Sequence, residues 1–96
     1  MQQYVITAYD GTDSDALARR MAARPAHLES IRPLRDAGHF IEGGAILNEA
    51  GQMIGSVLIM AFPTRDDLDK WLANDPYTTG EVWQQVEVRP FRRVKF

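Results

Sequence analysis

The 96-residue sequence contains no cysteine, which excludes disulfides, thiolate metal sites and cysteine nucleophiles together. It also lacks long hydrophobic runs, since no window approaches the roughly 20 apolar residues that a membrane-spanning helix needs. The first segment, MQQYVITAYDG, has neither the cationic start nor the apolar stretch of a signal peptide. We therefore expect a cytoplasmic protein without membrane partners.

Neither sign of charge is in large excess. Eleven basic and thirteen acidic residues give a formal charge of −2, so the chain offers no strong attraction for nucleic acid. The basic tail RPFRRVKF has a composition also found in proteins that bind single-stranded nucleic acid, but an edge strand protected by Arg and Lys explains it more economically. With 45% hydrophobic residues, the chain predicts one globular domain over residues 1–96.

Segments rich in apolar, β-branched and aromatic residues predict four strands. These are residues 3–9, 40–47, 53–62 and 82–88, and the middle two form a hairpin. Pro90 is expected to end the last strand.

Two helical segments separate these strands. The first is expected to open at Thr12, with acidic residues after this N-cap, and to close at Gly38. Pro25 interrupts it and predicts either a kink or a division into two short helices. The second helix is capped by Thr64 and stopped before Pro76.

This order of elements predicts an α+β, ferredoxin-like split βαββαβ fold: a four-stranded antiparallel sheet with both helices on one face. The first and third strands are apolar on both faces, so the face without helices also needs cover. A second copy of the chain is the simplest cover, and we therefore expect a homodimer.

His27 lies at the border of the apolar stripe of the first helix, where we expect it to be half-buried. Position alone favours a hydrogen-bonded core histidine, whereas a nearby carboxylate would make it an acid or base near neutral pH. Asp75 continues the apolar stripe of Leu68, Trp71 and Leu72 on the second helix. An Asx-Pro turn would explain Asp75 alone, but a pair of His27 and Asp75 would explain both residues.

Five further residues are candidates for substrate binding, each with a structural alternative. Arg24 could bind an anionic substrate or lie solvated, and Ser56 could be a polar group in a pocket or a small core residue. Tyr77 could contact a ligand or pack its ring against the turn. Gly43 and Gly44 permit close approach of a ligand, although a β-bulge or tight sheet packing is at least as plausible.

A metal site is not expected. The two histidines lie on different elements, and the sequence lacks the ligand clustering that zinc or iron requires. His39 is most simply a surface residue, and we assign it no role. No cofactor is implied.

Six stretches make the chain resemble the YciI-like (YCII-related) proteins over nearly its whole length. They are YVITAYD, RPAHL, GHFIEGGAI, GSVLIM, NDPYTTG and VEVRPFRRV, of which RPAHL together with DPY is fairly specific. The resemblance implies a ferredoxin-like fold, a dimer related to the dimeric α+β barrels, and a pocket whose acid-base dyad falls on His27 and Asp75. One branch of that family eliminates chloride from a chlorinated hydroxyquinol, and muconolactone isomerase-like proteins share the architecture.

Two functional hypotheses follow. The first is a cofactor-independent enzyme in which His27 transfers protons and Asp75 orients it, acting by elimination or isomerisation on a small cyclic or enol-forming substrate. The second is a non-catalytic dimeric module that binds a small molecule or a partner, with His27 and Asp75 as a structural link between the helices.

Overall fold

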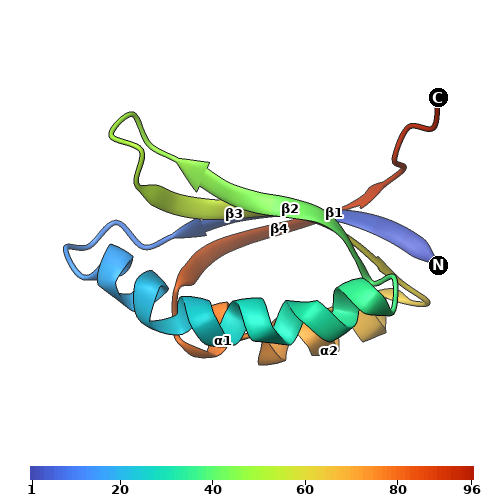
Figure 1. The fold of residues 1–96 in the computed structure, drawn as a ribbon, viewed down its shortest axis with the longest axis horizontal. Coiled ribbons are helices and arrows are strands. Elements are labelled where there is room, and N and C mark those ends of the chain that lie inside the picture. Colours follow the sequence, from blue (N-terminus) through green and yellow to red (C-terminus); the bar gives the residue numbers. More distant parts are fainter.

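The computed structural model describes residues 1–96 and contains one sheet and three helices. The strands are β1 (Gln2–Asp10), β2 (Phe40–Leu47), β3 (Met53–Phe62) and β4 (Trp83–Phe91), and the helices are α1 (Ala16–Asp36), α2 (Arg65–Asn74) and α3 (Pro76–Thr79). The sheet is antiparallel in the order β2-β3-β1-β4, and the helices cover one of its faces (Figure 1). The predicted ferredoxin-like α+β fold is confirmed.

The core lies between the helices and the sheet because alternate strand residues point to this side. On β1 the sequence alternates so that Tyr4, Ile6, Ala8 and Asp10 are buried, while the residues between them are more exposed. The apolar core comprises Tyr4, Ile6, Ala8, Ile31, Leu58, Met60, Phe62, Leu68, Tyr77, Val82 and Trp83. Asp10 therefore places a carboxylate on the face that otherwise holds the core.

Helix α1 is continuous although it contains Pro25 and Pro33, so of the two predicted outcomes, a kink or a division into two short helices, the division does not occur. Each proline removes the donor that would bond the carbonyl four residues earlier, here on Met21 and Glu29. Both of these residues and both prolines are exposed, so water can bond the released carbonyl groups. The opposite side of α1 packs on the sheet and keeps the helix in place.

The two helix starts differ in how well they were predicted. Thr64 caps α2 as expected, accepting a hydrogen bond from the Asp67 N–H at 3.2 Å. Helix α1 begins at Ala16 and not near Thr12, because the Asp13 carboxylate bonds the Asp15 N–H in a loop conformation.

Two further expectations are corrected. Strand β4 continues through Pro90 to Phe91, since β4 lies at the sheet edge, where a proline is tolerated. His39 is half-buried, not a surface residue: its Nδ1 lies 2.8 Å from the Ala61 carbonyl oxygen and its ring stacks on Phe62.

The outer face of the sheet carries no helix (Figure 1). Cross-strand register places Val5, Tyr9, Val57 and Ile59 on this face, and the side chains of Tyr9 and Val57 remain 45% and 36% exposed. The apolar outer face inferred from the sequence is therefore present. No helix of the chain combines the length and the hydropathy required to cross a bilayer.

Candidate active site

His27 and Asp75 come from different elements and meet beneath α1. The Nδ1 atom of His27 lies 2.8 Å from Oδ2 of Asp75, and the two side chains are 9% and 0% exposed. His27 is therefore buried, contrary to the expected half-burial. It takes this position because it lies one turn before Ile31 on the sheet-facing side of α1.

Asp75 lies at the junction of two helices and satisfies several groups at once. It follows α2 in an extended conformation and caps α3, where its Oδ2 accepts a hydrogen bond from the Tyr77 N–H at 2.9 Å. Ser30 Oγ lies 3.4 Å from its other oxygen. Both explanations offered for Asp75, the local turn and the contact with His27, therefore describe its geometry.

The partners of Asp75 determine which nitrogen of His27 is available. The Tyr77 N–H can only donate, and an ionised Asp75 can only accept, so Nδ1 of His27 serves as the donor of their bond. The other nitrogen, Nε2, makes no hydrogen bond within the protein. In neutral His27 this nitrogen carries the free lone pair.

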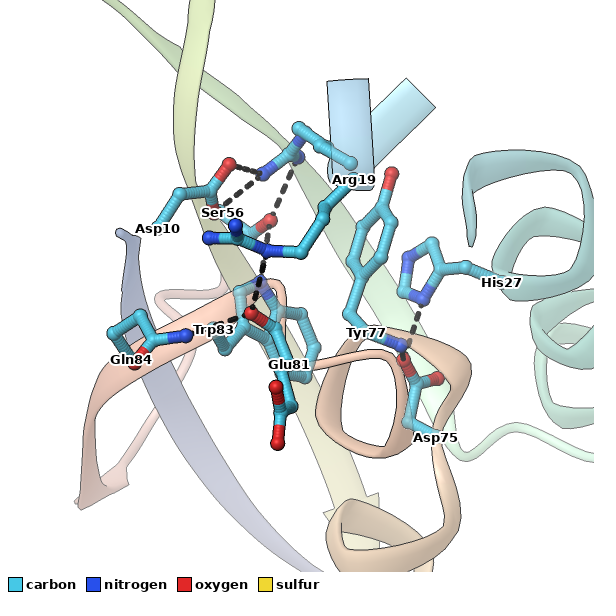
Figure 2. Close-up of polar contacts among 10 residues, drawn as sticks. Asp10, Arg19, His27, Ser56, Asp75, Tyr77, Glu81, Trp83 and Gln84 are labelled. Atoms are coloured by element: carbon cyan, nitrogen blue, oxygen red, sulfur yellow. Dashed lines mark hydrogen bonds and ion pairs between the residues drawn. The ribbon is translucent and has the colours of Figure 1, made fainter. Parts of the chain in front are cut away.

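Two aromatic side chains fix the imidazole ring from its sides. Tyr77 stacks on it with 3.9 Å between ring centroids, and Trp83 meets it edge-on at 5.8 Å. Figure 2 shows the Tyr77 ring between His27 and the cluster that contains Asp10 and Ser56. Burial raises the pKa of the Tyr77 hydroxyl, and the positive charges of Arg20 and Arg24 partly oppose this change.

A cavity of about 250 Å³ opens next to this cluster. It is lined from α1, β2, β3 and α3 by Arg20, Arg24, His27, Leu28, Ile31, Phe40, Gly43, Gly44, Ala45, Met53, Ser56, Leu58 and Tyr77. The structure thus brings six of the seven candidate residues to one cavity, and Asp75 lies behind His27. The volume of the cavity suits a ligand of about one ring and lies below the volumes of pockets that bind drug-sized ligands.

The two glycines on the cavity wall differ in why they lack a side chain. A Cβ atom on Gly43 would lie 2.9 Å from the Val57 carbonyl oxygen, so close packing within the sheet requires glycine there. A Cβ atom on Gly44 would meet nothing within 4 Å. The structural alternative therefore accounts for Gly43, whereas nothing in the protein demands glycine at position 44.

Sequence reasoning missed three buried polar residues beside the cavity. Arg20 Nη1 donates to both oxygens of Asp10 at 3.0 and 3.1 Å, and Arg20 Nη2 donates to Ser56 Oγ at 2.9 Å. The indole N–H of Trp83 donates to the same oxygen at 3.2 Å. Arg20 also lies with its guanidinium carbon 4.7 Å from the centre of the Tyr77 ring.

Two signals could have identified this network. Arg20, Arg24 and His27 are spaced at i, i+4 and i+7, which places all three on one side of α1. Asp10 continues the buried alternation of β1, so its carboxylate needs a cation on the helix side.

A larger and more open hollow of about 990 Å³ lies beside the loop after β1. Within it Arg19 binds both oxygens of Asp13 at 2.8 Å and lowers the pKa of that carboxyl to about 2. It holds neither histidine. The contact between His27 and Asp75 is therefore at the smaller cavity.

The sequence of the whole fold matches a known family. The model of the YCII-related domain matches residues 2–92. The chain belongs to the YCII-related family. Protein YciI of Escherichia coli O6:H1 is 35% identical to it in an alignment that covers 95% of this chain and 97% of the relative.

One further relative of this YCII-related protein is named after a biosynthesis cluster, and one similar solved structure is named as an enzyme. Derivative of benzaldehyde biosynthesis cluster protein C of Emericella nidulans is 32% identical, covering 80% of this chain and 87% of the relative. The 5-chloro-2-hydroxyhydroquinone dehydrochlorinase of Burkholderia phenoliruptrix, solved with 2,5-dihydroxybenzoquinone, superposes with a TM-score of 0.83 and 26% identity. That match covers 96% of this chain and 95% of the dehydrochlorinase.

A more distant structure shares the fold alone. It is a dimeric ferredoxin-like protein from Jannaschia sp. CCS1, with a TM-score of 0.56 and 13% identity over 97% of this chain and all of the other.

Proposed function

We propose that this YCII-related protein is a cofactor-independent acid-base enzyme that acts on a small cyclic or enol-forming substrate by elimination or isomerisation. The observation that carries the proposal is the unpartnered Nε2 of a buried His27 at the wall of a cavity, with Nδ1 held 2.8 Å from Asp75.

In this mechanism Nε2 of His27 takes a proton from the bound substrate. The Asp75 carboxylate keeps the imidazole in the required tautomer and stabilises the positive charge that the ring then carries. In an elimination the substrate loses this proton and a leaving anion, whereas in an isomerisation Nε2 returns the proton to a second atom. Neither reaction needs an oxidant or a second reactant.

The dehydrochlorinase neighbour supports elimination over isomerisation. Its name describes the removal of chloride from a ring compound, and its bound 2,5-dihydroxybenzoquinone is a single six-membered ring. A ring of that size is compatible with the cavity of about 250 Å³ beside His27.

A second candidate function is a dimeric binding or interaction module without catalysis. Asp75 caps α3 and His27 packs against two aromatic rings, so both residues also serve the structure. In that case the contact of His27 with Asp75 links α1 to α3, and turnover is absent.

Chloride release from 5-chloro-2-hydroxyhydroquinone separates the two functions. We expect His27→Gln to lower the rate by about 100-fold or more, because positioned acid-base catalysis contributes 10² to 10⁴-fold. His39→Gln is the matched control and keeps the wild-type rate, since His39 contacts Ala61 and Phe62 and does not line the cavity.

The stability of His27→Gln completes the test. Losing the bond to Asp75 should cost about 1–3 kcal/mol of the free energy of unfolding, measured in urea. Unchanged turnover in this variant would contradict the acid-base role. Absence of both turnover and 2,5-dihydroxybenzoquinone binding in the wild type would favour the interaction module.

We also propose that the protein is a homodimer whose subunits pack through the outer faces of their sheets. The exposed Tyr9 and Val57 side chains support this arrangement, because burying apolar surface drives association.

A further inference from the structure

The hydroxyl of Ser56 is held in one hydrogen-bonding role. Its oxygen accepts from Arg20 Nη2 at 2.9 Å and from the Trp83 indole N–H at 3.2 Å. A guanidinium and an indole N–H can only donate, so both lone pairs of the Ser56 oxygen are occupied. Ser56 can therefore act toward a ligand only as a donor.

The proton of Ser56 has no acceptor within the protein. The side chain makes no hydrogen bond as a donor, although Ser56 is only 3% exposed. The residue lines the cavity next to His27. A buried donor without a partner is costly, so this proton is set to meet an acceptor that arrives with a ligand.

The charge at the same cavity is positive. Arg24 lines it and forms no hydrogen bond or ion pair, in contrast to Arg20, whose charge is balanced by Asp10. The two nearest carboxylates are already engaged, Asp10 by Arg20 and Asp75 by His27. The cavity thus offers two side chains that can only donate, Ser56 and Arg24, and the second of them is an uncompensated cation.

We infer that Ser56 and Arg24 form a receptor for an ionised oxygen of a single-ring ligand, an enolate or a phenolate. Asp10 and Trp83 are positioning residues, because they do not line the cavity and act on the ligand only by fixing Arg20 or Ser56. Arg20 lines the cavity and also holds Ser56 as a donor. This inference rests on the proposed function, since removing a proton from an enol-forming substrate at His27 leaves negative charge on such an oxygen. Donors fixed in advance stabilise that charge without having to reorient.

The test uses 4-nitrophenol as a probe, because only its phenolate form is yellow and both forms are present near neutral pH. Binding of each form to the full-length protein is measured by absorbance and calorimetry at pH values on both sides of its titration. We expect the phenolate to bind at least about tenfold more tightly than the phenol, and the bound probe to turn yellow at lower pH than the free probe.

Ser56→Ala and Arg24→Gln should each weaken phenolate binding by roughly 10-fold to 100-fold and change phenol binding little. Ser14→Ala, in the exposed loop before α1, and Arg32→Gln, on the exposed side of α1, are the matched controls. Both controls should retain the wild-type preference.

Trp83→Phe separates positioning from simple support of the fold. It frees one lone pair of the Ser56 oxygen, so the hydroxyl can turn and accept a hydrogen bond from the neutral phenol. Phenolate binding should fall while phenol binding holds or improves, whereas damage to the fold would weaken both forms equally.

The outcomes distinguish this inference from the proposed function. Equal binding of the two forms by the wild type, or an unchanged preference in Ser56→Ala, overturns the inference and leaves the role of His27 intact. If Ser56→Ala fails to fold, the preferences of Arg24→Gln and Trp83→Phe decide the same question. If neither form binds the wild type, the cavity takes no single ring, and the proposed function then falls with the inference.

Discussion

The two faces of the sheet each carry an ion pair of similar length in very different surroundings. On the helix-covered face Arg20 meets Asp10 at 3.0 Å, and both side chains are 3% exposed. On the outer face Arg89 meets Glu87 at 2.9 Å, and these side chains are 69% and 60% exposed. The register of β4 against β1, with Glu87 opposite Thr7 and Arg89 opposite Val5, places the second pair on the outer face.

Surroundings, and not distance, decide what each pair does. Water screens the exposed pair, so either of its members can be lost at little cost. The buried pair has exchanged water for fixed partners, and removing one member leaves an uncompensated charge in the core. Because Arg20 is held in this way, it can hold Ser56 in turn, whereas Arg89 organises no other residue.

The largest expected effect comes from breaking the buried pair on one side. Arg20→Gln or Asp10→Asn should lower the free energy of unfolding by about 3–5 kcal/mol, because each leaves its partner charged and unpaired beneath α1. Urea unfolding followed by circular dichroism measures this change. A loss below about 1 kcal/mol would mean that water reaches this pair as it reaches the outer one.

The double variant Asp10→Leu with Arg20→Met sharpens the same comparison. Replacing both charges by apolar side chains should recover most of the stability, since the attraction of a buried pair barely exceeds the cost of removing it from water. It should not recover the preference of the cavity for phenolate, because Ser56 then loses its guanidinium partner. Recovery of both properties would show that Arg20 has no part in binding.

The buried pair also shows where sequence reasoning stops. Strand alternation is local, so the four strands, the two long helices, their order and the fold were predicted correctly, whereas the start of α1 and the separate helix α3 were not. The burial of Asp10 could be deduced from β1, but its partner could not, because the choice among several arginines on α1 depends on how the helix crosses the sheet. The continuity of α1 through Pro25 likewise depends on which side of the helix faces water.

The candidate site also has one part that the sequence predicted and one part that depends on tertiary packing. His27 and Asp75 were singled out because each is a polar residue in an apolar stripe, which is a pattern within one helix. Their separation of 2.8 Å, and the cavity that Arg24, Ser56 and Tyr77 share with His27, required the packing of α1 on the sheet. Ser56 is restricted to donating by two side chains from other elements, so no pattern in the sequence around Ser56 predicts this role.

An intermediate effect is expected from placing a charge on the outer face. In the proposed homodimer, Val57→Lys buries an unpaired ammonium group at the interface and should raise the dimer dissociation constant at least tenfold, roughly 1.4 kcal/mol or more. Sedimentation equilibrium measures the change. Met21→Lys adds the same charge to the exposed side of α1 and serves as the control, since Met21 is 46% exposed there. A wild-type protein that stays monomeric at every concentration would contradict the dimer.

The smallest effect is expected from the exposed pair on that same face. The Arg89 guanidinium lowers the pKa of the Glu87 carboxyl below its ordinary value. The folded state therefore favours the ionised form, so the stabilisation is present above about pH 4.3, the ordinary pKa of glutamate, and is lost as the pH falls through the lowered value. Glu87→Gln should remove this small pH dependence of the urea midpoint, with Glu49→Gln in the hairpin loop as a control that leaves it unchanged.

The dependence of stability on salt concentration shows whether Glu87 and Arg89 remain solvated when two copies of the chain associate. For a pair that remains solvated, the difference between wild type and Glu87→Gln shrinks as ionic strength rises, because counterions screen the charges. A difference that resists salt in the wild type, and becomes salt-sensitive in the Val57→Lys background, would mean that the second subunit covers Glu87 and Arg89. The outer pair would then behave as the Asp10 and Arg20 pair does beneath α1, with a partner subunit supplying the cover that the helices supply on the other face.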